Sequence, residues 1–185
     1  MAQVKKSGKK AFFDVAVPLT SSKIALYGES VEALDGKVVR LDLTRNLRGK
    51  SLELRFKVKL VDGKLIGEPI AVELIGSYVR RMMRGGVDYV EDSFKVTCKD
   101  ENVTVKPFMI TRNRVSRAVR NALRIEARKH LEAYLKTRTA IEVFSDITAN
   151  KIQRELSFEL KKIYPLALCE IRIFELIREA KLASA

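Results

Sequence analysis

The sequence predicts an α+β fold, with a mixed or antiparallel, partly barrel-like sheet, one long basic helix, two shorter C-terminal helices and a disordered basic N-terminal arm. Three observations predict it. Apolar and polar residues alternate with period two in parts of residues 36–110, which indicates strands. A segment without Gly or Pro follows and indicates helices, and an apolar run at residues 168–177 indicates a last strand. The order of strands, helices and a returning strand favours one globular domain over residues 12–185, preceded by an arm of residues 1–11.

The arm is polar, basic and without periodicity, which is typical of a segment that orders only on a partner. Its charge comes from four lysines: Lys5, Lys6, Lys9 and Lys10. A secretory signal requires an apolar run after its basic residues, and none follows these lysines.

Strands are expected at residues 37–43 and 51–60. The second is the clearer one, because every other residue is apolar: Leu52, Leu54, Phe56, Val58 and Leu60. Asp62 and Gly63 suit a tight hairpin turn, after which the chain returns through residues 65–72. Pro69 within this return strand predicts an edge position or a bulge.

A short helix capped by Ser77 is expected before Gly85 and Gly86. Its outer face carries Arg80, Arg81 and Arg84, which are available to phosphate and are further candidates for RNA binding. Two further strands follow at residues 93–99 and 103–110.

The long helix is predicted from about Arg114 to Lys136. Thr139 and Glu142 have the spacing of a capping box, so a second helix starts there. A third helix is marked by apolar residues at helical spacing and ends before Pro165: Ile152, Leu156, Leu160 and Ile163. The C-terminal strand is expected to complete a sheet begun much earlier.

The charge of the chain is the strongest functional signal. Lys and Arg number 36 against 23 Asp and Glu, a net +13, and most of the excess lies in residues 1–10 and 112–138. A concentrated excess predicts a polyanionic partner. The alternative is a charge that serves only solubility, which needs a modest and dispersed excess.

The arginines of the long helix concentrate this charge further. On a helical wheel they fall within an arc of about 120°: Arg114, Arg117, Arg120, Arg124 and Arg128. An apolar side is expected opposite them, formed by Val115, Ala118, Val119, Ala122, Leu123 and Ile125. Guanidinium groups suit phosphate oxygens, so this arc predicts phosphate binding. The alternative is a solvated face with ion pairs inside the helix.

Enzyme signatures are missing from the sequence. His130 is the one histidine, and the phosphate-loop, nucleophile-elbow and dinucleotide motifs are absent. Asp88, Glu91 and Asp92 could hold Mg²⁺ in a nuclease, but a solvated loop is the favoured interpretation. We therefore expect no catalytic residue, cofactor or metal.

Cys98 and Cys169 have no metal or redox spacing. The longest uncharged stretch has eight residues and is too short for a membrane helix.

Among nucleic acids, structured RNA fits best. Zinc fingers, a turn-helix pair and a dimerising repeat, which are typical of DNA readers, are not evident. Aromatic residues make up 7% of the chain and Trp is absent, so a stacking platform for single strands is weakly supported. RNA held through its shape, phosphates and 2′-hydroxyl groups remains.

Several stretches follow one another in a specific order: KKSGKKAFFDV at the arm, Gly36–Val39 with Leu41–Leu43, Arg55–Leu60, Thr111–Arg114 and Ile163–Leu166. Together they resemble the S-three-A-e (e-S-one) family of archaeal and eukaryotic small-subunit ribosomal proteins. The short termini resemble the archaeal form.

The resemblance implies a non-enzymatic protein of the cytoplasmic ribosome. It implies a place on the small-subunit platform near the mRNA exit, with small-subunit rRNA, neighbouring ribosomal proteins and mRNA as partners and with a role in translation. RNA binding is carried onto the arm lysines and onto Arg112, Arg114, Arg117, Arg120, Arg124 and Arg128. A free RNA-binding regulator or RNA chaperone outside the ribosome is the alternative.

Overall fold

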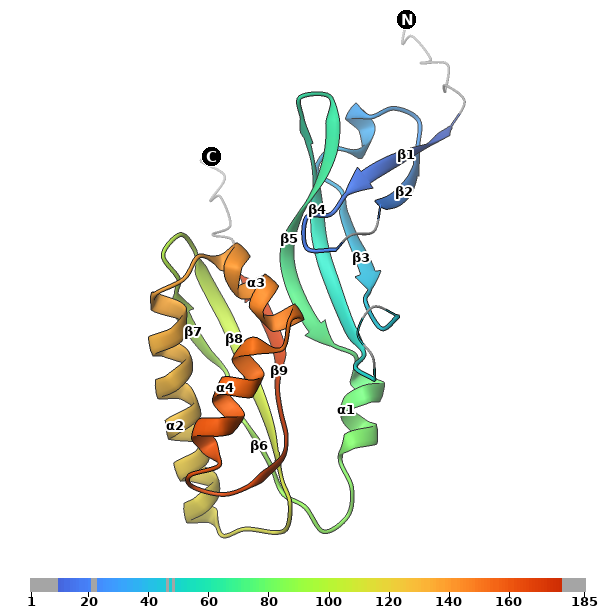
Figure 1. Cartoon of the computed structure of the whole chain (residues 1–185). Coiled ribbons are helices and arrows are strands. Elements are labelled where there is room, and N and C mark those ends of the chain that lie inside the picture. Colours follow the sequence, from blue (N-terminus) through green and yellow to red (C-terminus); the bar gives the residue numbers. More distant parts are fainter. Residues whose placement is uncertain (1–9, 21–22, 46, 48, 178–185) are drawn as a thin grey trace, which may run out of the picture. The chain divides into compact units, whose positions relative to one another are not determined.

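The structure is a computed structural model that describes residues 10–20, 23–45, 47 and 49–177 (Figure 1). In this part of the chain, nine strands form a mixed sheet and four α-helices accompany it, which confirms the predicted α+β class. The strands are β1 Ala11–Ala16, β2 Lys23–Gly28, β3 Val38–Asp42, β4 Leu52–Val61, β5 Lys64–Leu74, β6 Tyr89–Glu91, β7 Phe94–Thr97, β8 Asn102–Thr111 and β9 Leu166–Leu176. The helices are α1 Gly76–Met82, α2 Arg117–Lys136, α3 Ala140–Thr148 and α4 Lys151–Leu160. Within the described residues the sheet does not close into a complete barrel.

The chain divides into two compact units. Unit 1 comprises Met1–Leu41 and Arg55–Ile70, and unit 2 comprises Asp42–Leu54 and Ala71–Ala185. The single domain over residues 12–185 stays a prediction. None of the described helices is long and apolar enough to cross a membrane.

Unit 1 contains the best predicted hairpin. Phe56 and Val58 of β4 are fully buried, as their alternation with polar residues predicts. Asp62 and Gly63 both have positive φ, 50° and 75°, as the tight turn after β4 requires. The antiparallel ribbon of β1 and β2 was not predicted, and β1 also pairs in parallel with β5 at Leu65 and Ile66. On β5, Pro69 lies between this pairing and the pairing of residues 71–73 with β9, and β5 also pairs with β4.

Gly67 of β5 supports the packing of Phe56. A Cβ atom at Gly67 would lie 2.7 Å from Cδ2 of Phe56 and 3.0 Å from Cγ2 of Val17. We expect Gly67→Ala to lower the free energy of unfolding by about 1–3 kcal/mol through overpacking, measured by denaturant unfolding. Adding Phe56→Leu should recover part of the loss.

Gly76→Ala is the matched control for this change, because no atom lies within 4 Å of its added Cβ and its φ is not positive. Its free energy of unfolding should stay unchanged or rise slightly. Equal losses for the two alanine variants would contradict the tight packing at Gly67.

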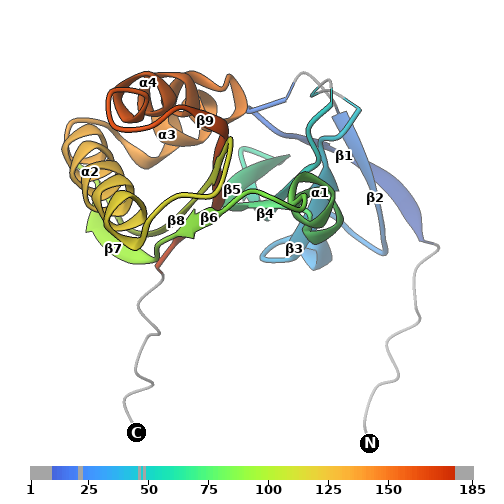
Figure 2. The ribbon, with the colours of Figure 1, turned by 90° about the horizontal axis from the view of Figure 1, so that it is seen from below.

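In unit 2, β9 pairs antiparallel with both β5 and β8, so the C-terminal strand joins a sheet begun much earlier, as predicted. Helices α2, α3 and α4 cover one face of strands β6 to β9 (Figure 2). β6 was missed, because its sequence, Tyr-Val-Glu, is short and flanked by acids.

Three helix boundaries differ from expectation. Helix α1 begins at Gly76 without a side-chain cap, because Ile75 rather than Ser77 is its N-cap. Helix α2 begins at Arg117 rather than near Arg114, because the Ser116 hydroxyl accepts the N–H of Val119 and fixes the first turn. Helix α4 ends at Leu160, which leaves Ile163 outside it and 40% exposed.

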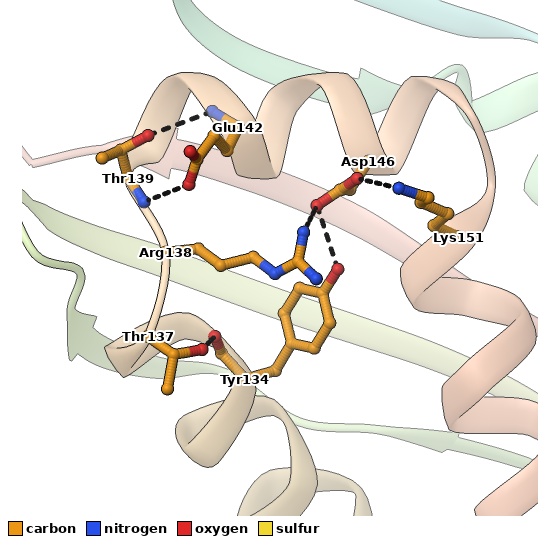
Figure 3. Close-up of polar contacts among 7 residues, drawn as sticks. All are labelled: Tyr134, Thr137, Arg138, Thr139, Glu142, Asp146 and Lys151. Atoms are coloured by element: carbon orange, nitrogen blue, oxygen red, sulfur yellow. Dashed lines mark hydrogen bonds and ion pairs between the residues drawn. The ribbon is translucent and has the colours of Figure 1, made fainter.

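A polar cluster joins the C-terminal end of α2 to α3 (Figure 3). The capping box of Thr139 and Glu142 is present as predicted. The buried carboxylate of Asp146 accepts hydrogen bonds from Arg138 Nη1 at 2.6 Å and from the Tyr134 hydroxyl at 2.9 Å. Burial, and then the bond to Asp146, raise the pKa of Tyr134. Arg138 therefore has a structural role, although it belongs to the basic segment 112–138.

Candidate nucleic-acid interface

The loop before α2 is held by Asp88. Its carboxylate accepts the N–H of Val115 at 2.9 Å, and its backbone carbonyl accepts the N–H of Thr111 at 2.9 Å. Arg112 and Arg114 are exposed in this loop. Arg114 therefore precedes the helix whose arginine arc it was expected to join.

The two sides of α2 differ from the predicted ones. The buried residues follow a spacing of four along the helix: Leu123, Ala127, Leu131 and Leu135. Of the expected apolar side, Ala118 and Ala122 are exposed and Ile125 is 56% exposed. At 100° per residue, the buried stripe and the arginines lie on the same side of the helix. In the second half of α2 this side of the helix packs into the core, and in the first half the same side carries the arginines Arg117, Arg120 and Arg124.

The first half of α2 borders a groove of about 730 Å³ beside β6. Helix α2 contributes Arg117, Ala118, Arg120, Asn121 and Arg124, and the strand contributes Tyr89, Val90 and Glu91. We call this feature the α2–β6 groove. All of its lining residues belong to unit 2.

The groove has an excess of positive charge. Arg124 donates to Oδ1 of Asn121 at 2.8 Å, which directs its guanidinium group. The side chains of Arg117 and Arg120 bind no other described residue. Glu91, the acid of the lining, is paired with Arg172 at 2.8 Å, and it forms no ion pair with the groove arginines among the described residues. The first turn of α2 contains no acid, so helix dipole and arginines both favour an anion here.

Arg128 has a different environment. Its Nε lies 2.9 Å from Glu132 Oε1, and its guanidinium lies 5.2 Å from the centre of the Phe94 ring. It does not line the groove. The pair with Glu132 is of the kind that the ion-pair alternative expects, and RNA binding at Arg128 stays a prediction. The groove arginines are Arg117, Arg120 and Arg124.

The other predicted binding residues do not line the groove. Arg80 and Arg81 lie on α1 and Arg84 lies in the loop after it; all three are exposed, and Arg81 stacks 5.5 Å from the Tyr78 ring centre. Lys10 is exposed just before β1 in unit 1. Lys5, Lys6 and Lys9 are outside the described residues.

The acids considered for Mg²⁺ have separate structural roles. Asp88 holds the loop before α2, Glu91 pairs with Arg172, and Asp92 accepts the N–H of Ser93 at 2.9 Å. Across the residues that the structure describes, no group of three His, Cys, Asp or Glu side chains could hold a metal ion. The two cysteines are buried, and desolvation raises the pKa of the Cys98 thiol to about 11 and that of the Cys169 thiol to about 12.

Sequence reasoning missed the two groove residues that could contact a ligand through an aromatic ring or an amide, Tyr89 and Asn121. One weak signal for Tyr89 was available: it is an aromatic residue in a short segment of mostly polar residues, two positions before Glu91. Asn121 lies between two of the arginines at helical spacing, so the wheel that grouped the arginines could have included it.

Comparison with known proteins gives a consistent result. A small ribosomal subunit protein eS1 of Nanoarchaeum equitans is 27% identical over 177 residues, which cover 91% of this chain and 89% of that protein. The eS1 protein of Sulfurisphaera tokodaii is 28% identical over 181 residues, 91% and 92% of the two chains. That of Methanothermobacter thermautotrophicus is 29% identical over 136 residues, 70% and 68%. The model of the Ribosomal S3Ae family matches residues 3–180. Since this match covers nearly the whole sequence, the chain belongs to the Ribosomal S3Ae family.

Proposed function

We propose that this protein is a structural constituent of the small ribosomal subunit that binds small-subunit rRNA and supports translation. The observation that carries the proposal is the α2–β6 groove, whose arginines have no acidic partner among the described residues. Relatives along most of the chain are small ribosomal subunit proteins eS1, which supports the ribosomal context. Membership of a family of structural ribosomal proteins also means that the chain is not an enzyme.

The location belongs to the same proposal. The protein lies on the platform near the mRNA exit of the cytoplasmic ribosome, beside neighbouring ribosomal proteins and within reach of mRNA. Its arm binds rRNA through the concentrated positive charge of four lysines, Lys5, Lys6, Lys9 and Lys10. The exposed Arg112 and Arg114 extend the groove's charge along the loop before α2. Arg80, Arg81 and Arg84 form a second basic surface on and after α1.

Sedimentation tests the ribosomal role. A tagged copy is expressed in the cells that encode the protein, and the lysate is separated on sucrose gradients before and after a high-salt wash. We expect the chain to sediment with small subunits in both conditions, and chemical probing of the rRNA to find protection in the platform. A chain that leaves the subunits on washing and retains a discrete other RNA would instead support the free regulator or chaperone.

A further inference from the structure

Tyr89 is an exposed aromatic residue at the edge of the described sheet. It is 52% exposed, although β6 places it among residues that line the α2–β6 groove. The ring of Phe108, itself fully buried, lies 6.4 Å from the Tyr89 ring, centre to centre, with 34° between the planes. The Tyr89 ring is therefore supported from inside the fold while half of the residue remains open to a ligand.

The groove opposes this ring with three arginines. Arg117, Arg120 and Arg124 cover about 10 Å of helix axis, which gives room for more than one phosphate. Oδ1 of Asn121 is occupied by Arg124, so the Asn121 amide N–H₂ is the group left to donate to a ligand. An aromatic ring, an amide donor and several guanidinium groups thus line one groove.

This combination discriminates between forms of RNA. A duplex offers phosphates and 2′-hydroxyl groups, but its bases are stacked on one another and cannot stack on a side chain. An unpaired nucleotide can place its base on an aromatic ring while cationic side chains hold the backbone. The groove volume of about 730 Å³ is in the range of small-molecule sites, which is large enough for a nucleotide.

We infer that the α2–β6 groove binds an unpaired stretch of small-subunit rRNA, with one base stacked on Tyr89 and adjacent phosphates held by Arg117, Arg120 and Arg124. The inference rests on the proposed function and names the form of RNA that this site takes. It differs from the expectation from composition, which favoured structured RNA held through its shape, phosphates and 2′-hydroxyl groups over single strands that stack on aromatic side chains.

The test compares two RNA probes, a short single strand and the duplex of the same sequence, by fluorescence anisotropy at one salt concentration. Tyr89→Leu should weaken binding of the single strand by about 5- to 100-fold and leave duplex binding unchanged. Tyr89→Phe keeps the ring and should bind as the unmodified chain does. The matched control is Tyr27→Leu, which removes a tyrosine of similar exposure, 58%, from β2. A single strand carrying 5-iodouridine should form its photo-cross-link at Tyr89.

Equal losses for single strand and duplex, or for Tyr89→Leu and Tyr27→Leu, would overturn the inference. Cross-linking of the groove to an acidic segment of a neighbouring ribosomal protein in intact subunits, in place of rRNA, would also overturn it. If Tyr89→Leu leaves both affinities unchanged while the chain still sediments with small subunits, stacking is refuted and the ribosomal role stands. If the unmodified chain binds neither probe nor small subunits, the proposed function itself fails.

Discussion

Lys50→Met should lower the free energy of unfolding by about 3–5 kcal/mol, because it leaves a buried carboxylate without its cation. The side chains of Lys50 and Glu170 are 7% and 11% exposed, and Nζ of Lys50 contacts Oε2 of Glu170. The same Nζ donates to Oδ1 of Asn150 at 2.6 Å. Methionine is one atom shorter than lysine but has nearly its volume and carries no charge, so the loss measures mainly the ion pair rather than a cavity.

The loss should also depend on pH. Burial raises the pKa of Glu170 above 4.5, and Lys50 opposes that rise. In the Lys50→Met variant the pKa of Glu170 in the folded state rises further. The folded variant therefore binds a proton at Glu170 more tightly than the unfolded chain does. Its deficit should therefore be smallest near and below pH 4.5 and should grow as the pH rises through the folded-state pKa. Denaturant unfolding at several pH values measures this trend.

The double variant Lys50→Met with Glu170→Gln is the control, since it removes both charges and leaves an amide near Asn150. It should recover most of the stability lost by Lys50→Met alone at neutral pH. Losses that simply add in the double variant, or a deficit independent of pH, would contradict a coupled buried pair.

The sequence could not have revealed this pair. Lys50 lies just before β4 in a segment without periodicity, and Glu170 occupies a position in β9 that alternation assigns to the side opposite Cys169 and Ile171. Burial of both depends on which segments the sheet brings together. By contrast, the alternation that buries Phe56 and the Thr139 capping box are local patterns, and both were predicted correctly.

The candidate site shows the same limit. The arginine arc of α2 was found from spacing, but its relation to the core was assigned wrongly. A buried stripe with a spacing of four drifts by about 40° for every four residues, so one side of a long helix can change its neighbours from end to end. The groove also needs β6, whose three residues are too few for a reliable period-two signal. Tyr89 becomes a candidate only when β6 lies beside α2.

Replacing Arg117, Arg120 and Arg124 together by Gln should have the largest effect on RNA binding. If each arginine meets about one phosphate, the slope of log affinity against log salt should fall by about 2–3, and affinity near 0.1 M salt should fall by about 100- to 1,000-fold. The fold should be retained, because no other described residue binds the side chains of Arg117 and Arg120 and their mutual repulsion is relieved. Salt titrations on small-subunit rRNA measure the slope, and melting curves measure the stability.

Arg128→Gln is the matched control, because Arg128 lies on the same helix and side but is engaged by Glu132 and the Phe94 ring. Compared with the single variant Arg120→Gln, it should change the salt slope little and should lower the melting temperature slightly, since it loses a cation–π contact worth about 0.5–1 kcal/mol. Lys129→Gln removes an exposed charge from the opposite side of α2 and separates a local effect from the net charge of the chain. Equal slopes for Arg120→Gln, Arg128→Gln and Lys129→Gln would mean that RNA responds to overall charge and does not enter the groove.

An unchanged slope in the triple variant would place the phosphate contacts elsewhere, with Arg80, Arg81 and Arg84 as the next residues to replace.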